Sequence, residues 1–318
     1  MSPVVRVRPA APGPDVPLVP FRVTLRLDEL VLAARIADLP LPVRTDRLMR
    51  EDRFSDRLAG TPASEARAVL AAALARVEDD GPDGARASLT ARGLLGGDTV
   101  DVGVVAALSV LAAGPLGALL DVALVRAEGD LRLRSWFGAA PSTVAQLSTT
   151  DGLEHELAWF APALWVSQVT RAVSVEPWVP RPAPLALPDF VSLPSELLAG
   201  SEKAHRERRA DLVPALAATY AGRVRLGDAR AVRAADPDEV LRLLSTLGTA
   251  TRGRLRMATR RRDREDADPA VASWLLLDDG WHELRPGRDA TAVLRRRDAH
   301  DLGLLSRPAV AAVTEVAA

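Results

Sequence analysis

The chain has 318 residues, of which 48% are hydrophobic and 26% are charged, and its formal net charge is −1. A chain of this length and composition can bury one large or two modest cores, which excludes a disordered protein. The nearly neutral charge argues against a general affinity for nucleic acid or anionic membranes. Because the sequence has no cysteine, it excludes disulfides, thiolate nucleophiles and cysteine metal sites.

The first 20 residues predict an irregular, proline-rich tail. They contain six prolines and lack the apolar core of a signal peptide. No later stretch has the roughly 18 consecutive apolar residues that a membrane helix needs. We therefore expect a soluble, cytoplasmic protein without membrane insertion. Arginine replaces lysine almost completely, Lys203 being the only lysine, which is typical of G+C-rich codon usage.

The first predicted unit, residues 21–176, begins with a strand that runs into a helix. Residues 23–27 alternate as a strand does, and Asp28 can cap the first turn of the helix that follows. Asp101 opens an apolar helical stripe that Gly114 ends. The remaining predicted elements are a helix over 64–77, a loop over 78–86, a glycine turn over 93–97, a hairpin of 122–126 with 131–137, strands over 143–147 and 154–160, and a helix over 162–173.

A proline-rich linker over residues 177–188 separates this unit from a second one, residues 189–318, in which the same order of elements begins again. Asp236 and Glu239 form a capping box around Pro237, at the start of a helix that ends at Gly248. The other elements of the second unit are a strand over 190–193, a helix from Ser195, a hairpin of 255–260 with 271–277, strands over 281–284 and 291–296, and a final helix that Pro308 interrupts or restarts.

The repeated order predicts an α+β fold with two pseudo-symmetric halves, each made of antiparallel strands and packed helices. A Ser-Trp pair recurs in corresponding strands, at residues 135–136 and 273–274. Several elements must coincide for the order to match, so the order is stronger evidence than the dipeptide.

The histidines and arginines leave two other functions open. His155 lies between Glu154 and Glu156, but alternation on a strand places both glutamates on the opposite face, which favours a solvated strand edge. An enzyme would need His155 or His282 to meet carboxylates from distant segments. A DNA-binding regulator would use the arginine cluster of residues 252–264, but acidic residues interleave with its far end and aromatic residues are absent nearby.

Several short motifs resemble the EspG family, the secretion-associated chaperones of actinobacterial type VII (ESX) secretion systems. These motifs are the strand and helix start over residues 23–30, the segment 37–42, the segment 91–94, and the late segments 253–255, 273–275 and 279–281. The resemblance covers about residues 21–318 and implies a two-fold repeated α+β fold. It also implies a cytoplasmic, non-enzymatic chaperone without a cofactor, which binds the helical tip of secreted PE and PPE heterodimers and keeps them soluble.

Two departures from the family widen the expected range of substrates. The loop over residues 126–130 is shorter than the substrate-contacting loop of PPE-binding members, and the proline-rich tail is extra. The partner is therefore expected to be either a PE/PPE-like or a WXG-like helical protein. An apolar groove rimmed by charge would suit such a partner. The candidate partner-binding residues are Leu241, Leu244, Leu247, Arg260 and Arg262.

Overall fold

The computed structural model describes residues 19–41, 83–125, 131–174, 187–228, 231–262 and 269–314. The predicted helix over 64–77, the loop over 126–130, most of the tail and most of the linker lie outside these ranges. The boundaries between the two predicted units therefore stay a prediction.

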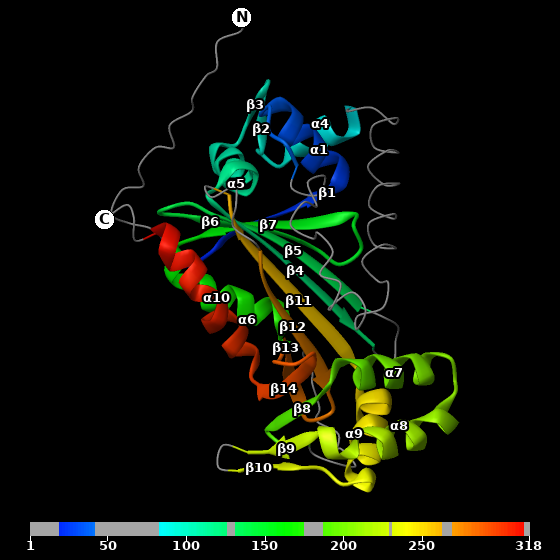
Figure 1. The fold of residues 1–318 in the computed structure, drawn as a ribbon. Helices are drawn as coiled ribbons and strands as arrows, with labels where there is room; N and C mark the ends of the chain where they lie inside the picture. Colours follow the sequence, from blue (N-terminus) through cyan, green and yellow to red (C-terminus); the bar gives the residue numbers. More distant parts are fainter. Residues whose placement is uncertain are drawn as a thin grey trace, which may run out of the picture.

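Within the described ranges, the first half contributes strands β1 to β7 and four α-helices (Figure 1). Its elements are β1 (Phe21–Arg26), α1 (Leu27–Ile36), α4 (Asp83–Ala91), β2 (Leu95–Gly96), β3 (Thr99–Val100), α5 (Val102–Ala113), β4 (Leu116–Leu124), β5 (Leu131–Ala139), β6 (Val144–Thr149), β7 (Glu154–Phe160), a 3₁₀ turn (Pro162–Leu164) and α6 (Trp165–Val173).

The second half repeats this order. Its elements are β8 (Phe190–Pro194), α7 (Ser195–Arg206), a 3₁₀ turn (Ala210–Leu212), α8 (Val213–Tyr220), a 3₁₀ turn (Ala221–Arg223), β9 (Arg225–Gly227), β10 (Val232–Ala234), α9 (Pro237–Ala250), β11 (Gly253–Arg261), β12 (Ala270–Leu277), β13 (Gly280–Pro286), β14 (Thr291–Arg297) and α10 (Ala299–Thr314). The short hairpin of β9 with β10 joins the main sheet, whereas β2 with β3 does not.

Twelve of the strands form one antiparallel sheet in the order β1-β7-β6-β5-β4-β11-β12-β13-β14-β8-β9-β10, and β2 pairs with β3 separately. The first five strands in this order come from the first half of the chain and the rest from the second half. β4 and β11 pair at the centre and join the halves (Figure 1). The α+β prediction with two pseudo-symmetric halves is confirmed.

The strand pairing gives the sequence displacement between equivalent residues of the two halves. Ala118 lies opposite Phe137 in the first half, and Leu255 lies opposite Trp274 in the second, so both partners are displaced by 137 residues. The same displacement relates the β5–β6 and β6–β7 pairings to β12–β13 and β13–β14. At the centre, Leu120 pairs with Met257, its own equivalent. The pseudo-two-fold axis therefore passes between these two residues.

The recurring Ser-Trp pair does not belong to this duplication. With the displacement of 137 residues, the equivalent of Trp274 is Phe137, and Trp136 corresponds to Ser273. Trp136 packs in the N-terminal core, whereas Trp274 packs in the core on the opposite face of the sheet. Neighbouring residues of a strand point to opposite faces of the sheet, so a shift of one position places the two tryptophans on opposite faces. The dipeptide match was wrong as evidence of a repeat.

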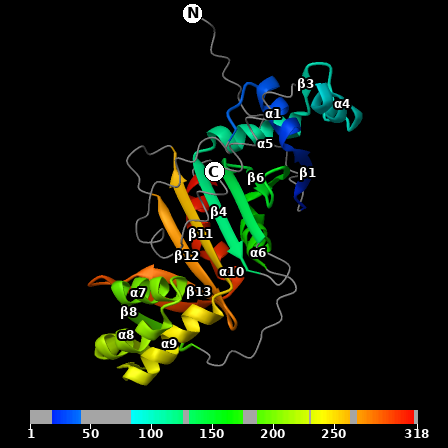
Figure 2. The ribbon, with the colours of Figure 1, turned by 90° about the vertical axis from the view of Figure 1, so that its right-hand side faces the viewer.

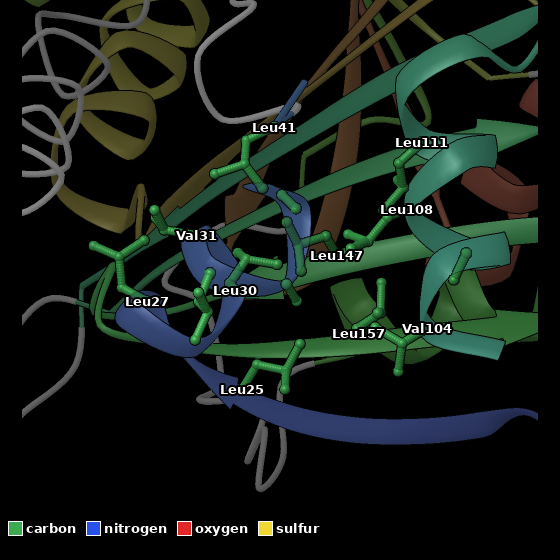
Figure 3. Close-up of a cluster of buried hydrophobic side chains, with 14 of the residues drawn as sticks. Leu25, Leu27, Leu30, Val31, Leu41, Val104, Leu108, Leu111, Leu147 and Leu157 are labelled. Atoms are coloured by element: carbon green, nitrogen blue, oxygen red, sulfur yellow. The ribbon is translucent and has the colours of Figure 1, made fainter. Parts of the chain in front are cut away.

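The sheet has two differently covered faces, which we call the pair face and the lobe face. On the pair face, α6 and α10 pack side by side over a core that includes Leu120, Met257 and Trp274 (Figure 1). On the lobe face, α1, α4 and α5 form an N-terminal lobe, whose leucine-rich core is shown in Figure 3. Helices α7, α8 and α9 form a separate C-terminal lobe on the same face. None of the helices within the described ranges is long and apolar enough to cross a membrane.

Helix starts follow the predicted caps in α5 and α9 but not in α1, and α7 begins at Ser195 without a side-chain cap hydrogen bond. Asp101 accepts hydrogen bonds from the amides of Gly103 and Val104, and Asp236 forms the predicted capping box with Glu239. In α1 the cap position belongs to Arg26 instead of Asp28, because the Glu29 carboxylate reaches back to the Arg26 amide at 2.8 Å.

Two other local predictions were wrong. The predicted loop over residues 78–86 contains the start of α4 at Asp83. The last helix, α10, continues through Pro308 without a break. Proline removes the hydrogen bond to the carbonyl of Leu304. Leu304 is 43% exposed, so water can satisfy that carbonyl.

Candidate functional site

The centre of the lobe face carries a band of charged and small side chains between the two helical lobes. Strands β4, β11 and β12 cross this region between the helix groups (Figure 2). We call this band the central strip. It consists of Asp121, Ala123, Arg132, Arg134, Arg254, Arg256, Val271 and Ser273.

Alternation along the strands produces the central strip. On β11, Leu255 and Met257 are buried in the pair-face core, so the intervening Arg256 points to the lobe face. On β5, Leu133 packs against the pair-face core, and the adjacent Arg134 takes the lobe face. The same strands are therefore apolar toward α6 and α10 and charged toward the gap between the lobes. A sheet face with this pattern is suited to contact with water or with a partner.

Ion pairs order the side chains of the strip. Arg134 Nε lies 2.6 Å from Asp121 Oδ1, and its guanidinium lies 5.8 Å from the ring centre of Trp136. Arg254 Nη2 lies 2.7 Å from Oε1 of Glu202, which belongs to α7 in the C-terminal lobe. The Arg254 pair ties the strip to the C-terminal lobe, and the Arg134 guanidinium contacts the N-terminal core through Trp136. Val271, 36% exposed, adds an accessible apolar side chain at its edge.

The strip breaks the pseudo-symmetry of the backbone that carries it. With the displacement of 137 residues, Arg254 corresponds to Gly117, Arg256 to Leu119, and Asp121 to Ala258. Each charged residue thus has an uncharged equivalent across the axis. A surface with two-fold backbone geometry and one-sided chemistry distinguishes the two orientations of anything that binds to it.

The predicted leucines lie in the core of the C-terminal lobe. Leu244 is fully buried, Leu247 is 8% exposed, and Leu241 is half-buried against the same cluster. Residues spaced three and four apart on α9 form its inner stripe, which packs within the lobe. Leu244 and Leu247 are buried within the lobe, so they form no open groove in this conformation, and a partner-binding role for the three leucines stays a prediction.

The predicted arginines separate in the structure. Arg262 Nη1 donates to the carbonyl oxygens of Leu111, Ala112 and Gly114 at 2.9, 3.2 and 3.4 Å, and so caps the C-terminal end of α5. Its burial lowers the pKa of Arg262 from the ordinary value. Arg260 is half-buried on β11. Whether Arg260 or Arg262 touches a partner stays a prediction.

The arginine cluster proposed for nucleic acid does not form one surface stripe. Arg252 forms an ion pair with Asp278, and Arg254 pairs with Glu202. Arg261 Nη1 donates to the carbonyl of Ala312 in α10, on the pair face, at 3.1 Å. Alternation on β11 therefore divides the cluster between the two faces of the sheet. Arg264 lies outside the described residues.

The histidines are separated, and one differs from its expected setting. His155 is fully buried on β7, so the prediction of a solvated strand edge was wrong. Its burial outweighs the nearby Asp151 and lowers the pKa of His155 to about 4. His282 Nε2 lies 2.9 Å from Oδ1 of Asp279, three residues away in the adjoining turn. Within the described ranges, no group of three metal-binding side chains converges.

The residues of the central strip were not predicted as a site, although the sequence carries a pattern that indicates them. Alternating arginine and apolar residues over 131–134 and 253–257 indicate strands with one charged face. Only the pairing of β4 with β11 shows that the two charged faces adjoin at the centre of one sheet.

The sequence matches no protein-family model and no curated protein. Among solved structures, the chain is similar to the Mycobacterium tuberculosis type VII secretion system chaperone EspG5, determined in complex with a PE25-PPE41 dimer. The two chains share 13% sequence identity with a TM-score of 0.53. The match covers 92% of this chain and 96% of EspG5. The chain therefore has an EspG-like α+β fold.

Proposed function

We propose that this protein is a substrate-specific chaperone of a type VII (ESX) secretion system that acts in the cytoplasm. It binds a helical secreted protein of the PE/PPE or WXG kind, keeps it soluble and directs it to the secretion machine. The observation that carries this proposal is the fold match, which extends over nearly the whole length of both chains. The short motifs that resemble EspG proteins support the same family.

The central strip is the proposed binding surface for the helical end of the substrate. Its rim supplies charge through Arg254 and Arg256, and Val271 supplies an accessible apolar contact. A helix end, with its polar caps and apolar side chains, is complementary to such a mixture. Because the charged residues of the strip have uncharged equivalents across the pseudo-two-fold axis, we expect one substrate complex per chaperone, bound in a single orientation.

The proposed function is tested by co-expression with the helical secretion substrates encoded beside this gene. We expect affinity purification followed by size exclusion to yield a stable, stoichiometric complex, and the substrate to remain soluble only in the presence of the chaperone. If every neighbouring helical candidate stays unbound and equally soluble alone, the proposed function is wrong.

The proposed surface is tested by placing a charge on it. Val271→Asp adds a carboxylate to an accessible apolar contact, and we expect it to weaken substrate binding about tenfold. Leu304→Asp is the matched control, because Leu304 is similarly exposed, at 43%, but lies on α10 at the pair face. Calorimetric titration measures both variants. Equal affinities for Val271→Asp and the unmodified chain would place the binding surface elsewhere.

A further inference from the structure

The outer corner of the N-terminal lobe exposes apolar side chains at the edge of the sheet. Strand β1 is the terminal strand of the sheet, and Phe21 at its start is 51% exposed. The Phe21 ring stacks on Trp159 of β7, with ring centres 5.5 Å apart and an angle of 16° between the planes. Val19 and Val102 are 70% and 82% exposed. We call Val19, Phe21, Val102 and Trp159 the aromatic corner.

Gly103 brings the start of α5 into this corner. A Cβ atom at Gly103 would lie 2.8 Å from Cζ2 of Trp159, so the indole packs directly against the backbone of the first helical turn. Val102 is the neighbouring residue at the start of α5 and extends the apolar surface begun by Phe21 and Trp159. Residues of three elements, β1, β7 and α5, therefore meet at this corner.

The other half of the molecule shows that the fold does not require an apolar corner. The pairing of Leu25 with His155 corresponds to that of Leu193 with Ala292. The first strand is thus displaced by 168 residues and the later elements by 137, so the equivalents of Phe21, Trp159 and Val102 are Asp189, Arg296 and Glu239. These three equivalents are charged, and the equivalent of Val19, Leu187, is apolar but buried in the C-terminal core. Exposed apolar side chains that the fold does not need indicate an interaction site.

The two halves also differ in what borders their outer strands. Strand β8, the equivalent of β1, carries β9 on its outer side, with Phe190 opposite Gly227 and Ser192 opposite Arg225. Among the described residues, no strand lies outside β1. The C-terminal half therefore displays an antiparallel strand at the place that the N-terminal half leaves open.

Among the described residues, side chains bond to the outward-facing backbone groups at only one end of β1. Arg92 Nη2 donates to the outward carbonyl of Thr24 at 2.5 Å, and Glu29 Oε2 accepts from the outward amide of Arg26 at 2.8 Å. The backbone groups of Arg22 point the same way by the alternation of a strand, and no described residue bonds them. The stretch over residues 22–24 corresponds to 190–192, the residues that β9 covers in the other half, and among the described residues only the carbonyl of Thr24 in this stretch has an outward partner, Arg92.

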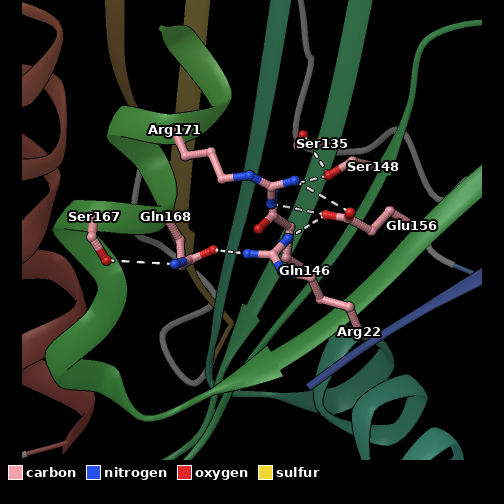
Figure 4. Close-up of polar contacts among 8 residues, drawn as sticks. All are labelled: Arg22, Ser135, Gln146, Ser148, Glu156, Ser167, Gln168 and Arg171. Atoms are coloured by element: carbon pink, nitrogen blue, oxygen red, sulfur yellow. Dashed lines mark hydrogen bonds and ion pairs between the residues drawn. The ribbon is translucent and has the colours of Figure 1, made fainter. Parts of the chain in front are cut away.

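The residues around this stretch indicate which side chains an added strand would carry. In the C-terminal half, Leu226 of β9 is only 7% exposed and packs in the core on the lobe face. An added strand beside β1 would likewise place an apolar residue near the aromatic corner. On the pair face, Arg22 and Arg171 share the single carboxylate of Glu156, which leaves one positive charge in excess (Figure 4). An acidic residue of the added strand complements that charge.

We propose that the aromatic corner and the adjacent edge of β1 bind an extended segment of a partner protein. The segment adds a strand antiparallel to β1 over residues 22–24. It packs an apolar side chain against Phe21 and Trp159, and it places a carboxylate beside Arg22. This surface is separate from the central strip and does not depend on the proposed chaperone function.

The test is a selection of short peptides displayed on phage against the full chain, with counter-selection against the double variant Phe21→Asp with Val102→Glu. At these two positions the variant carries the residues found at the other corner, which the same fold accommodates. Val232→Asp is the matched control, because Val232 is 50% exposed on β10 at the opposite edge of the sheet. Fluorescence anisotropy then measures the selected peptides on all three proteins, and circular dichroism confirms that each is folded.

We expect the selection to enrich sequences in which apolar and acidic residues alternate. Their affinity should fall about tenfold in the double variant and stay unchanged in Val232→Asp. The proposal is wrong if no peptide distinguishes the unmodified chain from the double variant. It is also wrong if the peptide binds only after residues 2–18 are deleted, since the chain's own N-terminal segment is then the occupant. Concentration-dependent dimers that the double variant abolishes would instead assign the corner to a second copy of the chain.

Discussion

Substitution of Gly138 by alanine should destabilise the protein by about 3 kcal/mol, the upper end of the usual cost of overpacking a core. Gly138 lies on β5 beneath α5. A Cβ atom there would lie 2.2 Å from the carbonyl oxygen of Val110 and 2.8 Å from Cα of Leu111. Both obstacles are backbone atoms, so no side-chain rotation can relieve the clash. The helix must move away from the sheet and disturb the packing of the N-terminal lobe.

Thermal and urea unfolding measure this effect, and the chain supplies a matched control. Gly84 lies in α4, and no atom lies within 4 Å of the position that a Cβ would take there. Gly84→Ala should therefore be neutral or stabilise by about 1 kcal/mol through helix propensity. A Gly138→Ala variant as stable as Gly84→Ala would show that α5 does not lie as close to β5 as the structure places it.

The equivalent position in the C-terminal half shows why glycine is needed in only one of the two halves. The equivalent of Gly138 is Leu275, which packs in the C-terminal lobe. The duplicated backbone therefore tolerates a leucine where α9 takes the place of α5. Close approach of α5 to the sheet, and not the strand pairing itself, makes glycine necessary at position 138.

Most of the regular elements were predictable from local pattern. The caps at Asp101 and Asp236 marked the starts of α5 and α9, and alternation marked the strands of the second hairpin. The first hairpin was predicted too short, because residues 116–120 of β4 are buried on both faces and show no alternation. Helix α8 and the hairpin of β9 with β10 had no strong periodic signal and were missed.

The candidate site was less predictable because it depends on pairing between distant strands. Leucine spacing on α9 marked an apolar stripe correctly, but spacing alone does not say whether a stripe faces a core or a partner. Leu244 is buried in the core of the C-terminal lobe, whereas the charged surface lies at the centre of the sheet, where β4 pairs with β11. That pairing joins residues far apart in the chain, and no local pattern encodes it.

Acidification should destabilise the protein through His155, by about 3 kcal/mol between neutral pH and pH 4. Burial lowers the pKa of His155 from 6.5 to about 4 in the folded chain. Between these values the unfolded chain binds a proton that the folded chain does not, so the free energy of unfolding rises with pH. The contribution is complete above about pH 6.5 and is lost as the pH falls to about 4.

Urea unfolding as a function of pH measures this contribution, and the slope is the informative quantity. His155→Leu removes the titrating group from the N-terminal core, so its free energy of unfolding should depend less steeply on pH between 4 and 6.5 than that of the unmodified chain. His300→Gln changes an exposed histidine on α10 and should keep the original slope. Parallel pH profiles for His155→Leu and the unmodified chain would mean that His155 is accessible to water. The packing of β7 against β1, where His155 lies opposite Leu25, would then be looser than the structure shows.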